Sequence, residues 1–143
     1  MGVRIVDFEK LLAERNRSNP FAQYVGVVIT KIEEGYAEAS LEIREEHLNP
    51  VGYVHGGVLY TMADVAAGAA TVSLGSHAVT VSGEYHYLAP AKGTKEVTTV
   101  AKCIKKGKTI LVFDLEVYTA EKKLVGKGTF TTYRLADQPI ILD

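Results

Sequence analysis

Alternating hydrophobic and polar residues predict β-strands over much of the chain. Between residues 37 and 44, Ala, Ala, Leu and Ile at the odd positions alternate with Glu, Ser, Glu and Arg at the even positions. A strand with one buried face and one solvated face has this period of two. Further strands are predicted at about 24–32, 79–87, 95–105, 109–118 and 124–133. Short connections between the last four predict an antiparallel meander.

Helical patterns occur at two places. Phe8, Leu11 and Leu12 recur at helical spacing and predict a short amphipathic helix over 6–15, which Ser18-Asn19-Pro20 ends. The segment 58–74 is instead rich in Ala, Val and other uncharged residues on nearly every face. A helix of this kind is normally buried, because it has no polar stripe to turn toward water.

The order of these elements indicates the fold class. It runs helix, two strands, a long buried helix closed by Gly75, and then four strands. A single sheet wrapped around one apolar helix accounts for this order. We therefore expect an α+β protein with a six-stranded antiparallel sheet around a long central helix, forming one domain over residues 1–143.

Asp64 is the one formal charge in the predicted central helix. An ionised carboxylate on a buried helix is costly unless it is paired, and this helix contains no basic residue. One interpretation is a locally exposed position or a cationic partner from elsewhere in the chain. The other is a functional site, because carboxylates in apolar surroundings are common there.

The residues before this helix, His55-Gly56-Gly57, are also unusual. The first amides of a helix have no partner within the helix and carry the positive end of its dipole. With glycines at this position, the carbonyl or anion of a ligand can approach those amides closely. A glycine-rich turn that only redirects the chain is the alternative.

The composition of the chain narrows the range of possible partners. The net charge of −1 gives no basic surface for nucleic acid or for an anionic membrane. The apolar run at 58–74 is interrupted by Asp64, which argues against a membrane span, and the N-terminus has no signal-peptide pattern. The lone Cys103 and the His residues lack metal-ligand spacing. We expect a soluble cytoplasmic protein with no metal or other cofactor.

The helix entry carries a motif of Asn49, His55-Gly56-Gly57 and Asp64. This spacing resembles that of the acyl-CoA thioesterases of the phenylacetate-degradation (PaaI-like) family, which have the hotdog fold. The resemblance covers nearly the whole chain, including Asn19-Pro20-Phe21 and Tyr87-Leu88-Ala89-Pro90-Ala91.

The resemblance implies a role for each residue of the motif. The Gly56 amide would polarise the thioester carbonyl, and Asp64 would act as general base or as nucleophile. Thr80 would help to orient the water, while Asn49 and His55 would lie beside the carbonyl and the sulfur. The substrate would be an acyl-CoA, with aryl or medium-chain acyl groups as candidates.

The spacing of Gly56 and Asp64 bears on the number of chains. They are eight residues apart, or about 12 Å along one helix. One carbonyl can meet both groups only if Asp64 comes from a second copy, so we expect a homo-oligomer with shared sites. The family commonly pairs sheets side by side, which implies a dimer and often a tetramer.

Further residues are expected to contact the substrate. Gly57 and Tyr60 lie beside the motif, and Lys105, Lys106 and Lys108 form a basic turn that could bind the CoA phosphates. Two other functions stay open, namely a hotdog hydratase or dehydratase and a non-catalytic acyl-CoA binder or sensor. The first needs a His at its own spacing, which His77 does not match, and the second has no use for Asp64.

Overall fold

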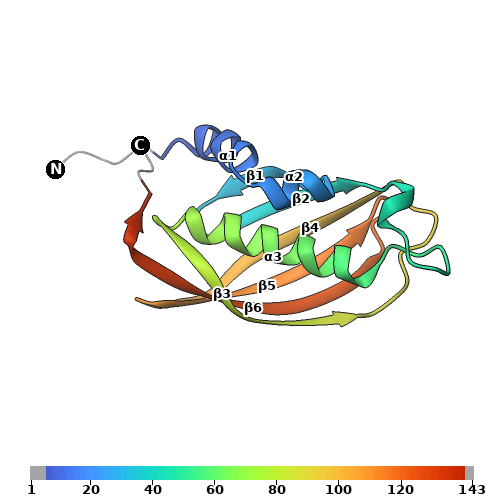
Figure 1. Ribbon diagram of the computed structural model, residues 1–143. Coiled ribbons are helices and arrows are strands. Elements are labelled where there is room, and N and C mark those ends of the chain that lie inside the picture. The colour runs from blue at the N-terminus through green and yellow to red at the C-terminus, as the bar shows by residue number, and fades with distance from the viewer. Residues whose placement is uncertain (1–5, 141–143) are drawn as a thin grey trace.

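The computed structural model describes residues 6–140. Six antiparallel strands form one curved sheet in the order β1-β2-β4-β5-β6-β3, and helix α3 lies in its concave face (Figure 1). The helices are α1 (Phe8–Arg17), α2 (Pro20–Val25) and α3 (Gly56–Val72), with a short 3-10 turn, η1 (Glu45–His47). The strands are β1 (Val28–Glu33), β2 (Tyr36–Glu42), β3 (Ser76–Tyr87), β4 (Glu96–Lys106), β5 (Ile110–Thr119) and β6 (Leu124–Pro139). The expected α+β hotdog arrangement is confirmed.

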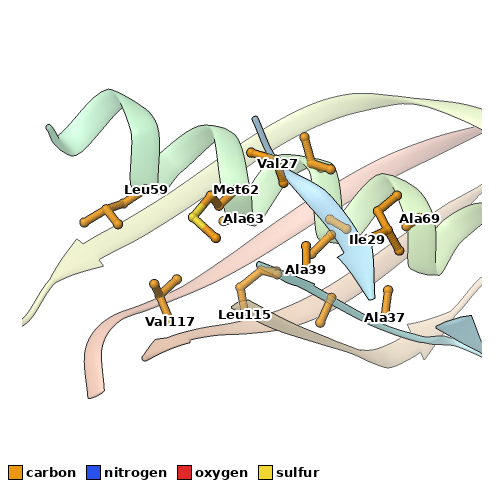
Figure 2. Close-up of a cluster of buried hydrophobic side chains, with 14 of the residues drawn as sticks. Val27, Ile29, Ala37, Ala39, Leu59, Met62, Ala63, Ala69, Leu115 and Val117 are labelled. Carbon is orange, nitrogen blue, oxygen red and sulfur yellow. The ribbon is translucent and has the colours of Figure 1, made fainter. Parts of the chain in front are cut away.

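The core lies between α3 and the inner face of the sheet. Leu59, Met62 and Ala63 point from α3 toward Leu115 and Val117 of β5 (Figure 2). Burying a side chain such as Leu59 or Met62 stabilises the fold by about 1.5–3 kcal/mol. Within the described residues, no helix is both long and apolar enough to cross a membrane.

The predicted alternation is confirmed in the central strands. In β5, Leu111, Phe113, Leu115 and Val117 are fully buried, while the residues between them are partly exposed. Strand β2 buries Ala37, Ala39 and Leu41 in the same way. The period of two therefore identified the strands with one face on the core.

The prediction that the last four strands form one meander is wrong. Strand β3 pairs with β6, and β4 pairs with β2 and β5. The segment between β3 and β4 instead crosses the end of the sheet, held by hydrogen bonds from the Leu88 amide to the Val125 carbonyl and from the Val54 amide to the Ala91 carbonyl. Only β4, β5 and β6 form a meander. This leaves β3 as an edge strand beside α3.

The strand predicted at 24–32 begins later, because residues 20–25 form α2. The Asn19 Oδ1 atom accepts from the Ala22 amide at 3.3 Å, Pro20 occupies the first turn, and Gly26 ends the helix with φ of 100°. These are the usual signals for starting and stopping a helix. The β-branched residues that favoured a strand belong to β1, which starts at Val28.

Candidate active site

Helix α3 begins at Gly56, two positions before the predicted start, and His55 caps it. The His55 Nδ1 atom accepts from the Gly57 amide at 2.8 Å. Since Nδ1 is an acceptor, the ring proton of the neutral imidazole lies on Nε2. Among the hydrogen bonds of the described residues, none is donated by the Gly56 amide. Gly56 therefore offers a free donor at the positive end of α3, whereas the Gly57 amide is already bound.

The tyrosines of β3 and α3 support this helix entry. The Tyr87 hydroxyl donates to the Gly56 carbonyl at 2.8 Å, and a Cβ atom at Gly56 would lie 3.1 Å from the Tyr87 ring. The Tyr60 hydroxyl donates to the Gly83 carbonyl at 3.2 Å, with its ring centroid 6.5 Å from that of Tyr85. Tyr60 thus lies on the side of α3 that faces β3.

Asn49 organises the loop that leads into α3. Its Oδ1 atom accepts from the amides of Val51 at 3.1 Å and Tyr53 at 3.0 Å. The bridge between Leu48 and Val54 closes this loop. Asn49 therefore shapes the approach to His55 through its carbonyl oxygen, which leaves the side-chain amide group available as a donor.

Asp64 lies on the face of α3 that is turned toward β3. The Thr80 hydroxyl donates to the Asp64 Oδ1 atom at 2.6 Å. This contact joins the middle of α3 to the edge strand. No other described residue donates to the second carboxylate oxygen, Oδ2, which is therefore available to a ligand. The position of Thr80, inferred only from the resemblance, is therefore in direct contact with Asp64.

A cavity of about 400 Å³ contains Asp64 and Thr80. Its other walls come from α1, α2, α3 and β3, and they are Arg15, Asn19, Phe21, Tyr60, Thr61, Val65, Gly68, Ala78 and Val79. We call this the Asp64 cavity. Its volume lies in the range of small-molecule sites.

Arg15 is a residue of this cavity that the motif does not contain. Its Nε atom is buried and has no hydrogen-bond partner in the part of the chain that the structure describes. Burial lowers the pKa of the Arg15 guanidinium from its usual value, and the Asp64 carboxylate acts in the opposite direction. The sequence contained one signal for Arg15. Arg15 follows Leu11 by four positions and Leu12 by three, so it lies on the same inner face of α1 as these two residues.

Gly68 of α3 makes room for Arg15. A Cβ atom at this position would lie 2.9 Å from an Arg15 Nη atom. A glycine inside a helix is destabilising by about 1 kcal/mol relative to alanine, so its place in α3 has a cost. The close approach of the guanidinium gives a physical reason for a glycine at this point.

The lysine turn is at the other end of the molecule from Gly56. Lys105, Lys106 and Lys108 are exposed at the turn between β4 and β5. The neighbouring Thr109 carbonyl accepts from the Arg134 amide, and the Arg134 side chain donates to the Leu74 carbonyl just beyond α3. Helix α3 has 17 residues, about 25 Å. One chain therefore does not bring the lysines to Gly56.

Gly56 and Asp64 are likewise separated within one chain. Gly56 contacts β3 through Tyr87, at the end of the strand, whereas Asp64 contacts it through Thr80. For a metal, the described residues offer no group of three His, Cys, Asp or Glu side chains that could hold an ion. The chemistry available here is that of a carboxylate, a helix-terminal amide and an imidazole.

A sheet of this topology wrapped around one long helix defines the hotdog class of folds. The family model of the thioesterase superfamily matches residues 51–125, which is more than half of the 143 residues. The acyl-coenzyme A thioesterase PaaI of Escherichia coli K12 is 30% identical over 114 residues, covering 80% of this chain and 81% of that protein. The chain belongs to the thioesterase superfamily and is a PaaI-like thioester hydrolase.

Solved structures agree with this assignment. The E. coli PaaI protein from the phenylacetic acid degradation operon superimposes with a TM-score of 0.86 at 25% identity, covering 93% of this chain and 96% of that chain. A Streptococcus mutans UA159 protein bound to acetyl-CoA gives a TM-score of 0.71 at 30% identity, covering 75% and 86%.

Proposed function

We propose that this protein hydrolyses an acyl-CoA to the free acid and CoA. The observation that carries the proposal is the Asp64 carboxylate, held by Thr80 in a cavity of about 400 Å³. The Gly56 amide adds a free donor at a helix N-terminus, where negative charge is stabilised. The similar E. coli PaaI is named an acyl-coenzyme A thioesterase, and the similar S. mutans protein binds acetyl-CoA.

The reaction can be written with these groups. The thioester carbonyl oxygen accepts from the Gly56 amide, which stabilises the oxyanion of the tetrahedral intermediate. As general base, Asp64 takes a proton from water and the hydroxide attacks the carbonyl carbon. As nucleophile, Asp64 attacks directly and forms an anhydride that water then cleaves. In both cases the carbon–sulfur bond breaks and the thiolate leaves.

His55 is suited to the leaving group. Its Nδ1 atom is bound to the Gly57 amide, so Nε2 carries the proton and can donate to the sulfur or to the carbonyl oxygen. The side-chain amide of Asn49 would act as a second donor beside it. Thr80, bonded to Asp64 Oδ1, fixes the carboxylate so that the other oxygen meets the water.

We further propose that two copies form each site. Gly56 of one copy and Asp64 of the other would then meet one carbonyl, which a single α3 does not allow. The edge strand β3 supports this arrangement, because Val79 and Val81 are 53% and 57% exposed along an unpaired edge. Exposed hydrophobic edges of this kind pair readily with another strand. Two such dimers would give the expected tetramer.

The lysine turn fits the same arrangement. It lies near the C-terminal end of α3, so in an antiparallel pair of helices it approaches the end that carries Gly56 of the other copy. Lys105, Lys106 and Lys108 would there meet the CoA phosphates. Replacing all three with Gln should raise KM for acyl-CoA while leaving kcat largely unchanged.

The test of the function is thiol release from short, medium, long and aryl acyl-CoAs. Asp64→Asn should lower kcat by about 10²–10⁴-fold, the usual contribution of a general acid or base. Asp114→Asn on the outer face of β5 is the matched control and should retain activity. An unchanged kcat in Asp64→Asn would reject the role of Asp64, and tight binding without release by the wild type would favour a non-catalytic binder.

The oligomeric state is tested separately by light scattering at the assay concentration. We expect two or four copies. A fully active monomer would contradict the shared site.

A further inference from the structure

Arg15 lies at the junction of two cavities. On one side is the Asp64 cavity. On the other side is a second cavity of about 430 Å³, lined by Leu11, Glu14, Arg15, Ser18, Val72, His77 and Ile140. Arg15 is the residue common to both. Its side chain therefore forms part of the wall of each cavity.

Among residues 6–140, the guanidinium at this junction has no hydrogen-bond acceptor. Its Nε atom is buried and finds no partner there, although a buried donor normally has one. The negative charge of Asp64 on α3 acts on this guanidinium. The hydrogen bond that Asp64 accepts among the described residues, however, comes from Thr80. The absence of a side chain at Gly68 lets the guanidinium lie close against α3, since a Cβ atom there would be 2.9 Å from an Arg15 Nη atom. The guanidinium is thus placed beside α3 on a residue that lines both cavities.

The Asp64 cavity has both polar and apolar walls. Phe21, Val65 and Val79 supply apolar surface, which suits the methylene groups of an acyl chain. A chain ending in a methyl group would offer the guanidinium no acceptor. A chain ending in an oxygen would satisfy it, and hydrogen bonds to charged groups are the stronger ones.

We propose that Arg15 is a specificity-determining residue that selects acyl groups whose far end carries an oxygen acceptor, a hydroxyl or a carboxylate. The acyl chain runs from Asp64 along the apolar walls, and its terminal oxygen accepts from the Arg15 guanidinium. This inference rests on the proposed thioesterase activity and names its class of substrate.

The experiment measures kcat/KM for CoA thioesters matched in length but differing at the end. Hexanoyl-, 6-hydroxyhexanoyl- and adipoyl-CoA form one set, and the corresponding four- and eight-carbon compounds form two more. In the wild type, at one of these lengths, we expect an oxygenated substrate to exceed its hydrocarbon counterpart by about tenfold, mainly through KM. Comparing the hydroxyl and carboxylate members identifies which terminus is bound.

Two variants test the residue. Arg15→Met replaces the guanidinium with an apolar side chain, so the preference should disappear and plain eight-carbon chains should improve. Gly68→Ala keeps the charge but displaces it, and it should weaken the same preference. Arg17→Met is the control, because the Arg17 side chain is 73% exposed and pairs with Glu14. It should leave the ratio unchanged.

The outcomes separate the two proposals. Release from all substrates with no preference at any length, or a preference that persists in Arg15→Met, overturns the role of Arg15 and leaves the thioesterase function intact. Absence of release from every substrate overturns both. If Arg15→Met does not fold, as judged by circular dichroism, the ratio in Gly68→Ala decides.

Discussion

The two sides of α3 differ in what they contact. On the core side, Met62, Ala66 and Ala70 are fully buried against the sheet. On the side facing β3, Tyr60, Asp64 and Gly68 recur every four residues and line the Asp64 cavity. Because residues four apart share one face of a helix, these three form a single functional stripe.

The difference shows how one apolar helix supports both stability and chemistry. Neither side of α3 carries a row of charged side chains, since Gly68 and the alanines are small and uncharged. The apolar side chains on the core side are buried by packing within the same chain. The other side meets an edge strand, two cavities and a partly buried guanidinium, so a carboxylate can be kept there.

The largest effects should come from changing one side of α3 at a time and measuring both the free energy of unfolding and kcat. Met62→Ala leaves a cavity in the core and should lower the free energy of unfolding by about 2–5 kcal/mol. Its kcat at a temperature where it is folded should stay close to that of the wild type. Asp64→Asn should lower kcat strongly and leave the free energy of unfolding close to that of the wild type. Chemical denaturation combined with thiol release checks this, and a loss of kcat in folded Met62→Ala as large as in Asp64→Asn would remove the distinction.

A smaller effect is expected at the contact between α3 and β3. Thr80→Val removes the hydroxyl that donates to Asp64 at 2.6 Å and preserves the side-chain shape. A hydrogen bond to a charged group contributes about 1.5–3 kcal/mol, so kcat should fall by about ten- to a hundredfold. Thr80→Ser is the control and should keep most activity. Equal losses in both variants would indicate packing and not the hydrogen bond.

The smallest effect concerns Tyr85, where the functional stripe meets the sheet. Its hydroxyl is buried and has no hydrogen-bond partner within the described range, 6–140, so Tyr85→Phe should leave stability at pH 7 unchanged or raise it by up to about 1 kcal/mol. Burial raises the pKa of Tyr85 above its usual value. The folded state therefore holds this proton more tightly than the unfolded state, and stability falls as the pH rises above about 10.

Thermal unfolding between pH 8 and pH 11 tests this linkage. Tyr85→Phe should lose less stability over that interval than the wild type. Tyr36, whose pKa is raised to about 12 chiefly by burial, adds to the alkaline loss in both proteins. Identical pH dependence in the two would exclude a contribution from Tyr85.

Much of the fold could be predicted from periodicity, because the core strands and α3 bury one regular face. Leu111 through Val117 and the apolar run of α3 lie where the pattern placed them. The position of β3 could not be predicted in this way. Its register is set by pairing with β6, far away in sequence, and alternation does not reveal the neighbour of a strand.

The same distinction between local and long-range information applies to the residues of the candidate site. Asp64, Gly56 and His55 are close in sequence, so a local motif reveals them. Arg15 lines the cavity of Asp64 from another helix, and nothing local distinguishes it from a solvated arginine except its spacing from Leu11 and Leu12. The capping role of His55 was also hidden, since His is an uncommon residue at that position.

The unpaired edge of β3 has a consequence for how the protein would behave in a cell. If each site takes Gly56 from one copy and Asp64 from another, turnover per chain depends on the abundance of the chain itself. By mass action, dilution would lower the activity per chain. A chain lacking Asp64 and a chain altered at Gly56, each inactive alone, would regain activity when mixed, because one of the two sites in the hybrid is intact.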